Sequence, residues 1–145
     1  MRFARLLTTA SMVWVLAIMF SAVPTAQGNM TDEDYDKLMK SVGATIGSLR
    51  KNVEAQASDG IVADAKKMTE LMKGNQAFWT QRKNTEAADW AKGAADHAAA
   101  IEKGAAAKDM AAVGDHTKQL MATCQTCHMK NRDKAADGTY IIKKS

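Results

Sequence analysis

Apolar residues recur every three or four positions along most of the chain after residue 28, which is the periodicity of an amphipathic helix. The clearest stripe comprises Tyr35, Leu38, Met39, Val42, Ile46, Leu49 and Val53. Thr31 stands before this stripe with Asp34 three positions later, and that pair predicts a capping box at the helix start. We therefore predict a first helix from Thr31, with the segment 58–60 ending or following it.

The same periodicity predicts three further helices. Their expected ranges are about 61–79, 86–104, and 109 to beyond Arg132. Gly74 is a weak point in the second helix, and the polar residues 82–85 form the next turn. Residues 138–142 are expected to form an extended tail that packs back on the helices.

Composition supports helices throughout this region, which is rich in Ala, Lys, Met, Glu and Gln and poor in aromatic residues. The single proline, Pro24, lies before it. Four amphipathic helices with short connections fold most simply as an antiparallel four-helix bundle with a cofactor between facing helices. We therefore predict an all-α fold, with residues 29–145 forming one domain.

Residues 1–28 have the pattern of a secretory signal peptide. Arg2 and Arg5 precede an apolar run over 6–20, and small or polar residues follow, with cleavage expected after Ala26 or Gly28. An uncleaved anchor is the alternative, although an apolar run of about 15 residues is shorter than the ~20 that span a bilayer. The pattern predicts export to a bacterial periplasm, without stable membrane insertion after cleavage.

The strongest chemical signal is the segment Cys124-Gln125-Thr126-Cys127-His128, which contains the only two cysteines of the chain. C-x-x-C-H is the pattern by which haem is covalently attached in c-type cytochromes. Two thiols one helical turn apart can form thioethers with the two vinyl groups on one porphyrin edge. The adjoining His128 is then placed as the proximal iron ligand. The motif predicts one covalently attached haem c.

Other readings of this motif remain open. A structural zinc site needs a fourth ligand, which only His97 or His116 could supply. A thioredoxin-like redox pair should open a helix after a strand, and no strand pattern precedes Cys124. A plain disulfide, or chance, is the remaining reading.

A C-terminal C-x-x-C-H on the last of four helices resembles the class II cytochromes c, the group of cytochrome c′ and its low-spin relative cytochrome c556. Arg132, four residues after His128, matches an arginine that usually follows the haem histidine, and Trp90 matches a recurrent aromatic residue. The resemblance implies a four-helix bundle holding haem c near the C-terminal helix, with Arg132 contacting the haem pocket. It also leaves a homodimer through the first two helices open.

The sharpest local match is Lys37-Leu38-Met39-Lys40-x-x-Gly43, which resembles the c556 segment whose methionine is the sixth iron ligand. In cytochrome c′ an apolar side chain there leaves the iron five-coordinate. Tyr35, Met39, Gly43 and Gly47 also share one i, i+4 row. The two glycines would let a porphyrin approach the helix backbone. The alternative is that Met39 is an ordinary core methionine.

Three features depart from the resemblance or lie outside it. The family places an aromatic residue just before the arginine, where this chain has Asn131. His97 and His116 lie on or beside inward helical stripes, and a partly buried structural or propionate-contacting role fits each better than iron ligation. Met121 and Met129 flank the motif and are expected to pack in the haem pocket.

The sequence thus predicts a periplasmic one-electron carrier with His128 and Met39 as iron ligands and periplasmic or membrane-bound redox proteins as partners. One alternative is a five-coordinate protein that binds nitric oxide or carbon monoxide, and another is a haem-free zinc or thiol-redox module. The formal charge of +4 falls to +2 without Arg2 and Arg5, and it gives no reason to expect nucleic-acid binding. No triad, phosphate loop or carboxylate pair indicates an enzyme.

Overall fold

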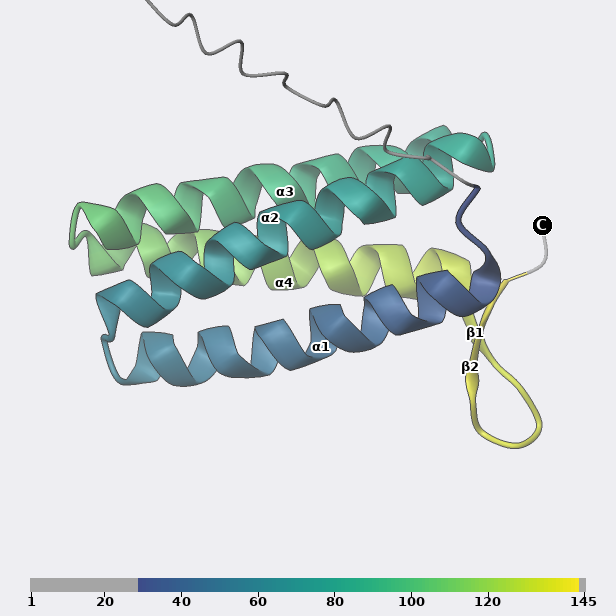
Figure 1. The fold of residues 1–145 in the computed structure, drawn as a ribbon, viewed down its shortest axis with the longest axis horizontal. Helices are drawn as coiled ribbons and strands as arrows, with labels where there is room; N and C mark the ends of the chain where they lie inside the picture. Colours follow the sequence, from purple (N-terminus) through teal and green to yellow (C-terminus); the bar gives the residue numbers. More distant parts are fainter. Residues whose placement is uncertain (1–28, 144–145) are drawn as a thin grey trace, which may run out of the picture.

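The computed structural model describes residues 29–143 as four helices followed by a two-stranded sheet (Figure 1). The elements are α1 (Asp32–Glu54), α2 (Ser58–Gln81), α3 (Thr85–Ala106), α4 (Met110–Asn131), β1 (Arg132–Lys134) and β2 (Tyr140–Ile142). Successive helices reverse direction and pack against one another, which confirms the predicted bundle (Figure 1). The predicted signal segment, 1–28, lies outside the described residues.

The start of α1 has the predicted capping box. The Asp34 backbone N–H donates to Thr31 Oγ1 at 3.1 Å, and the Thr31 N–H donates to Asp34 Oδ2 at 3.3 Å. Two amide groups at the helix start are thereby satisfied, and the acidic first turn complements the helix dipole. This cap fixes the residue at which α1 begins.

Three turns of one design join the four helices. Each places a non-glycine residue in the left-handed region, with φ of 52° at Gln56 and 58° at Lys83 and Lys108. In each turn the next amide reaches back to the carbonyl five residues earlier, for example Asn84 N–H to Trp79 O at 3.0 Å. These Schellman-type ends satisfy the last carbonyls and make the predicted short connections possible.

The core on the α2–α3–α4 side is built from small side chains. Six alanines along one stripe of α3 are each at most 7% exposed: Ala87, Ala88, Ala91, Ala94, Ala95 and Ala98. Small residues let helix backbones approach closely, and α3 packs tightly against both α2 and α4. By contrast, α1 packs against α2 but hardly approaches α4.

The prediction that Gly74 is a weak point is wrong, because α2 runs unbroken through it. A Cβ built at Gly74 would lie 2.9 Å from Leu38 Cδ1 of α1. The glycine therefore makes room for a neighbouring helix instead of ending its own.

The prediction that the fourth helix continues past Arg132 is also wrong. Arg132 adopts extended backbone angles (φ −114°, ψ 136°) and begins β1, which pairs antiparallel with β2. The return turn passes through Gly138 at φ +86°, a conformation that favours glycine. The tail predicted to be extended thus offers a strand partner for residues 132–134, and Ile142 packs back against the aromatic core cluster.

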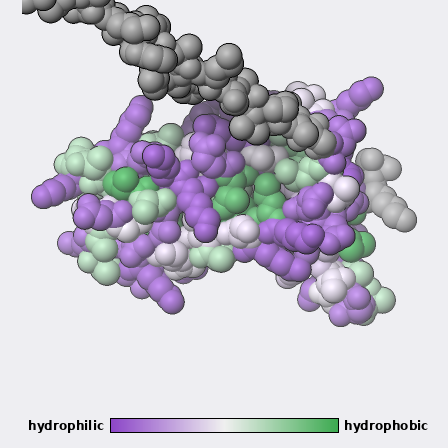
Figure 2. Space-filling view, viewed as in Figure 1, coloured by the Kyte–Doolittle hydropathy of each residue, from purple (hydrophilic) through white to green (hydrophobic). Residues whose placement is uncertain are grey.

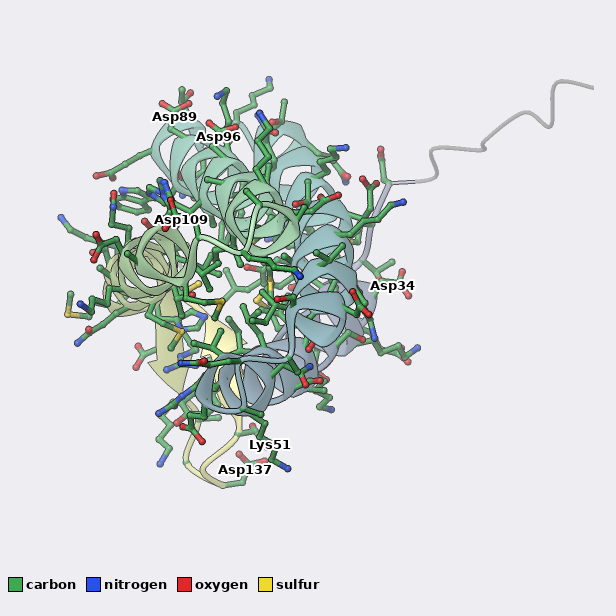
Figure 3. The ribbon with its side chains drawn as sticks, turned by 90° about the vertical axis from the view of Figure 1, so that its left-hand side faces the viewer. Asp34, Lys51, Asp89, Asp96, Asp109 and Asp137 are labelled. Atoms are coloured by element: carbon green, nitrogen blue, oxygen red, sulfur yellow. The ribbon has the colours of Figure 1, made fainter. Side chains whose placement is uncertain are left out.

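Charged side chains cover most of the outer surface. Figure 2 shows a largely hydrophilic face with an apolar strip near its middle. In the end-on view Asp89 and Asp96 point away from the bundle, whereas most sulfur atoms lie among the helices (Figure 3). Within residues 29–143, no helix is both long and apolar enough to cross a membrane.

Candidate functional site

The last two turns of α4 carry Cys124, Cys127 and His128. Both thiols are free; Cys127 is buried, and Cys124 and His128 are half-buried. The cysteines are three positions apart, so both side chains lie on one face of the helix. Cys124 packs against the main core cluster of the bundle. The motif is therefore presented toward the bundle interior.

The surroundings of the two thiols hold them protonated. Burial raises the pKa of Cys124 from its ordinary value of 9.0 to about 11, and the neighbouring Cys127 adds to the shift. Burial also raises the pKa of Cys127, assisted by Glu86 and opposed by a hydrogen bond from Asn131. Reactive redox cysteines need the opposite environment, one that is electropositive and accessible and that lowers the pKa.

His128 lies in an environment that favours its neutral form. Burial lowers the pKa of this imidazole, and the positive charge of Arg132 lowers it further. A neutral imidazole has a nitrogen lone pair available for a metal, so the same surroundings suit an axial iron ligand.

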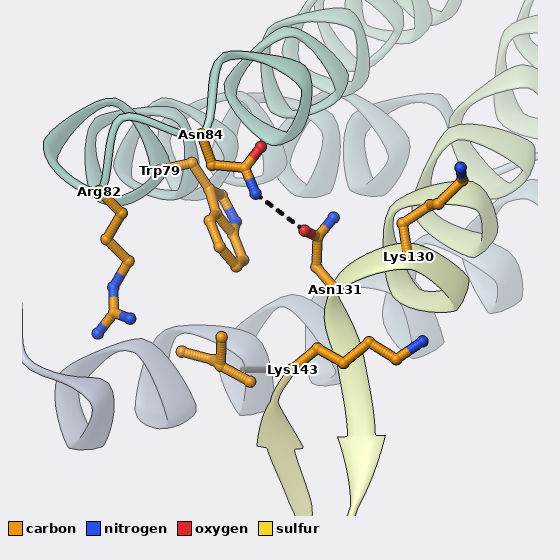
Figure 4. Close-up of a pocket in the computed structure, with 7 residues that line it drawn as sticks. Trp79, Arg82, Asn84, Lys130, Asn131 and Lys143 are labelled. Atoms are coloured by element: carbon orange, nitrogen blue, oxygen red, sulfur yellow. Dashed lines mark hydrogen bonds between the residues drawn. The ribbon is translucent and has the colours of Figure 1, made fainter. Parts of the chain in front are cut away.

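Asn131, which sequence reasoning treated only as a departure, fixes the end of α4. Its Nδ2 donates to the Cys127 carbonyl at 3.1 Å and lies 3.8 Å from Cys127 Sγ. Its Oδ1 accepts a hydrogen bond of 3.0 Å from Asn84 Nδ2, drawn as a dashed line in Figure 4. Because Asn84 also caps the start of α3, the two amides tie the motif-bearing turn to the neighbouring helix. In the sequence, the only indication of this role is that Asn131 stands four positions after Cys127, close enough for its side chain to bond the Cys127 carbonyl.

A cavity of about 320 Å³ lies beside this amide pair, at the end of the bundle (Figure 4). Its lining residues are Trp79, Arg82, Asn84, Lys130, Asn131, Ile142 and Lys143. Arg82 is already paired with Asp32 of α1. Neither cysteine of the motif, nor His128, nor Met39 lines it, so this cavity is separate from the predicted haem contacts.

Met39, the predicted distal ligand, is half-buried on α1 and packs against both core clusters. One turn earlier, Tyr35 stacks on Phe78 with ring centroids 3.9 Å apart and accepts a hydrogen bond of 3.0 Å from Trp79 Nε1. These contacts fasten the first turns of α1 to the end of α2.

Tyr35 belongs to the first turns of α1, which also carry Met39. Burial raises the pKa of its phenol, and the charges of Cys127 and Cys124 add to the increase. The N-terminal turns of α1 and the C-terminal turns of α4 lie at the same end of the bundle (Figure 1). The structure therefore brings the α1 turns that carry Met39 to the end of the bundle that carries the motif.

Three observations bear on whether a planar group fits between α1 and α4. The two helices hardly approach each other, and a Cβ built at Gly43 or Gly47 would meet no heavy atom within 4 Å. Asn75 on α2 is only 6% exposed, yet its Oδ1 has no hydrogen-bond partner among the described residues. The sparse packing between α1 and α4 leaves room for an inserted group, whereas the two glycines are exposed on α1 and Asn75 lies on α2, so neither of these by itself marks that seam.

Arg132, expected at the haem pocket, is exposed at the start of β1. Its guanidinium carbon lies 4.0 Å from the ring centroid of Tyr140 on β2, a cation–π contact within the hairpin. Its link to the motif is its charge, which acts on His128. Trp90 packs against the aromatic cluster that includes Trp79.

His97 and His116 are half-buried, as predicted, and face each other across α3 and α4 with 3.3 Å between their Nδ1 atoms. In the part of the chain that the structure describes, no group of three or more His, Cys, Asp or Glu side chains is arranged to hold a metal ion. The two histidines and the C-x-x-C-H segment thus do not form one zinc cluster.

Comparison with known proteins adds no relative to these observations. No protein-family model, no curated protein and no solved structure matches the chain. Any functional assignment therefore rests on the motif and on the geometry of the bundle.

Proposed function

We propose that this protein is a periplasmic mono-haem cytochrome of the class II type, closest to cytochrome c556, which carries single electrons between periplasmic or membrane-bound redox proteins. Cys124 and Cys127 are the covalent tethers of one haem c, His128 is the proximal iron ligand, and Met39 is the distal ligand. The bundle is the scaffold that holds these side chains, and no catalytic residue is assigned.

One observation carries the proposal. The C-terminal end of α4, which carries the C-x-x-C-H turn, and the N-terminal turns of α1, which carry Met39, lie at the same end of the bundle (Figure 1). The seam between these two helices is sparsely packed, and a Cβ built at the exposed Gly43 or Gly47 of α1 would meet no heavy atom within 4 Å. A haem tethered to α4 can occupy this seam with α1 on its distal side.

The thiol environments support tethering over the haem-free alternatives. Zinc ligation and disulfide exchange both need thiolates. Burial raises the pKa of Cys124 and of Cys127, which disfavours the thiolate form. A thioether carries no charge and is compatible with such an apolar setting.

Haem iron, when bound by histidine and methionine, passes between its ferric and ferrous states by one electron, and the thioether sulfur favours the ferrous state. The chain's own contribution is positional. Asn131 holds the Cys127 turn against α3, and Tyr35 anchors the start of α1 on Phe78 and Trp79. Ligation by Met39 would fill the sixth iron position and so exclude small ligands from it.

One observation favours a second candidate, a five-coordinate protein that binds nitric oxide or carbon monoxide. Met39 already packs against both core clusters, which is the behaviour of a methionine with a purely structural role. If it keeps that position, the sixth iron site stays open to small ligands.

Visible spectra of the protein purified from the periplasm separate the two candidates. The electron carrier is expected to be low-spin in both oxidation states, with the methionine-to-ferric charge-transfer band lost in Met39→Ala. Met129 is 64% exposed, so the expectation that it packs in the haem pocket is wrong. Met129→Ala is therefore the matched control beside the motif, and it should keep the band. A high-spin ferric spectrum, with carbon monoxide binding after reduction, would establish the second candidate and overturn the first.

A further inference from the structure

His97 on α3 and His116 on α4 form a pair that the proposed function does not use. Their Nδ1 atoms are 3.3 Å apart, and their ring centroids are 5.6 Å apart with an interplanar angle of 38°. Both side chains are half-buried, and they join helices that are adjacent in the bundle. Two imidazole nitrogens from neighbouring elements therefore converge on one point.

The separation of the two nitrogens suits a shared metal ion. A tetrahedral centre with metal–nitrogen bonds of ~2.0–2.1 Å holds two imidazole nitrogens about 3.3–3.4 Å apart and their ring centroids about 5.2 Å apart. The observed centroid distance of 5.6 Å is slightly longer. A small rotation about each Cβ–Cγ bond corrects this difference, and such torsions have broad minima.

The contact is also longer than most hydrogen bonds to a nitrogen donor, which cluster at about 2.7–3.2 Å. Without a metal, one Nδ1 must carry a hydrogen and the other must accept it. A divalent cation replaces that single hydrogen and uses both lone pairs. Imidazole nitrogen is a preferred ligand of Zn²⁺, Ni²⁺ and Cu²⁺.

Access to the pair is open along α3. Gly93 lies one turn before His97, and a Cβ built there would meet no heavy atom within 4 Å. The neighbouring carboxylates do not compete, because Asp96 is paired with Lys92 and Asp115 with Lys118 on their own helices. Water can therefore supply the remaining ligands.

From this geometry we infer that His97 and His116 form a two-histidine site for a divalent transition-metal ion, which clamps α3 to α4. The site needs only two protein ligands, so it is compatible with the lack of any three-residue cluster within residues 29–143. It lies on α3 and α4, whereas the proposed haem lies between α1 and α4, so either site can exist without the other.

The test is the thermal unfolding midpoint of the purified protein with ZnCl₂ or with EDTA. A metal that binds only the folded state raises the midpoint. We expect Zn²⁺ to raise it by several degrees, and isothermal titration to give one Zn²⁺ per chain. His97→Gln and His116→Gln should each weaken binding at least tenfold and remove the rise, whereas the control Lys118→Gln should keep both.

Two further arms make the outcome independent of the haem assignment and of variant stability. The Zn²⁺-dependent rise should persist in Cys124→Ala/Cys127→Ala, which removes the other soft ligands. In the wild-type protein, the paramagnetic spectrum of bound Cu²⁺ should show two coordinated nitrogens. The inference is overturned if Zn²⁺ leaves the midpoint unchanged, if binding survives in the histidine variants, or if the Cu²⁺ spectrum shows no nitrogen ligand.

Discussion

Two seams of this bundle are built in opposite ways. Around α3, buried alanines let α3 pack closely against both α2 and α4. Ala87, Ala91, Ala94 and Ala98 are each at most 2% exposed. Between α1 and α4 the helices stay apart, and the small residues Gly43 and Gly47 of α1 are exposed, with no heavy atom within 4 Å of a built Cβ. Small residues thus serve close packing around α3, whereas the two glycines of α1 are not packed against a neighbour.

The difference shows that a small residue in a helix is not always required by close packing. A Cβ built at Gly104 on α3 would lie 3.2 Å from Val113 Cγ2 and 3.3 Å from the Asp109 carbonyl oxygen. A Cβ built at Gly47 on α1 would meet nothing within 4 Å. The first glycine is crowded by its neighbour, whereas the second is exposed on α1 and has no neighbour that requires a glycine.

The largest predicted effect is on the haem proposed to lie between α1 and α4. Cys124→Ala/Cys127→Ala should abolish covalent haem attachment completely, since both thioether sulfurs are gone. Mass spectrometry of the exported protein measures this as loss of the mass of one haem. The control Thr123→Ala, on the same turn of α4, should keep the haem, and a double variant that still carried a covalent haem would contradict the assignment.

The second effect concerns the thiols of the haem-free chain. A pKa of about 11 for Cys124, against its ordinary 9.0, means that the thiolate fraction near pH 8 is lower by roughly a hundredfold. Since burial disfavours the charged form, the rate of alkylation should be correspondingly slow in the folded protein and rise as pH increases toward that pKa. The rates with iodoacetamide, folded and in urea, measure this, and equal rates would show that the thiols are not buried.

The third effect tests the closely packed seam. Ala98→Leu places three extra carbon atoms where the side chain is 0% exposed. Overpacking of this kind costs about 1–3 kcal/mol of unfolding free energy. Urea denaturation measures the loss, and Ala106→Leu, at an exposed position of the same helix, should change stability by less than about 0.5 kcal/mol. Equal effects at both positions would mean that the seam is not tight.

The smallest effect compares the two glycines directly. Gly47→Ala in the haem-free chain should raise the unfolding free energy by up to about 1 kcal/mol, because alanine is the better helix former and meets no neighbour. Gly104→Ala should lower it instead, since the new methyl group crowds Val113. The same denaturation experiment checks both, and changes of equal sign would remove the distinction between the seams.

Much of the fold could be predicted from local chemistry. The capping box of Thr31 and Asp34 forms as its spacing indicates, and the four helices follow the apolar periodicity. The end of α4 could not be predicted, because Arg132 leaves the helix to pair with the tail, a contact between segments apart in sequence. Gly74 was misjudged for a similar reason, since its role depends on Leu38 of another helix.

In the candidate site too, local features could be predicted from the sequence, whereas contacts between helices could not. The spacing of Cys124, Cys127 and His128 is local, so the sequence alone puts their side chains on adjoining turns of one helix. The role of Asn131 could not be predicted, because its hydrogen-bond partner Asn84 lies at the start of a different helix. The pairing of His97 with His116 likewise depends on how α3 and α4 pack.

By itself, then, the sequence determined the helices, the first cap and the C-x-x-C-H spacing, since each depends on residues within a few positions of one another. Only the tertiary structure decided which seam stays open, that Tyr35 packs on Phe78 and Trp79, and that two histidines meet across α3 and α4. The physical reason is that distances between helices are set by the side chains of both partners together, and no local pattern encodes them.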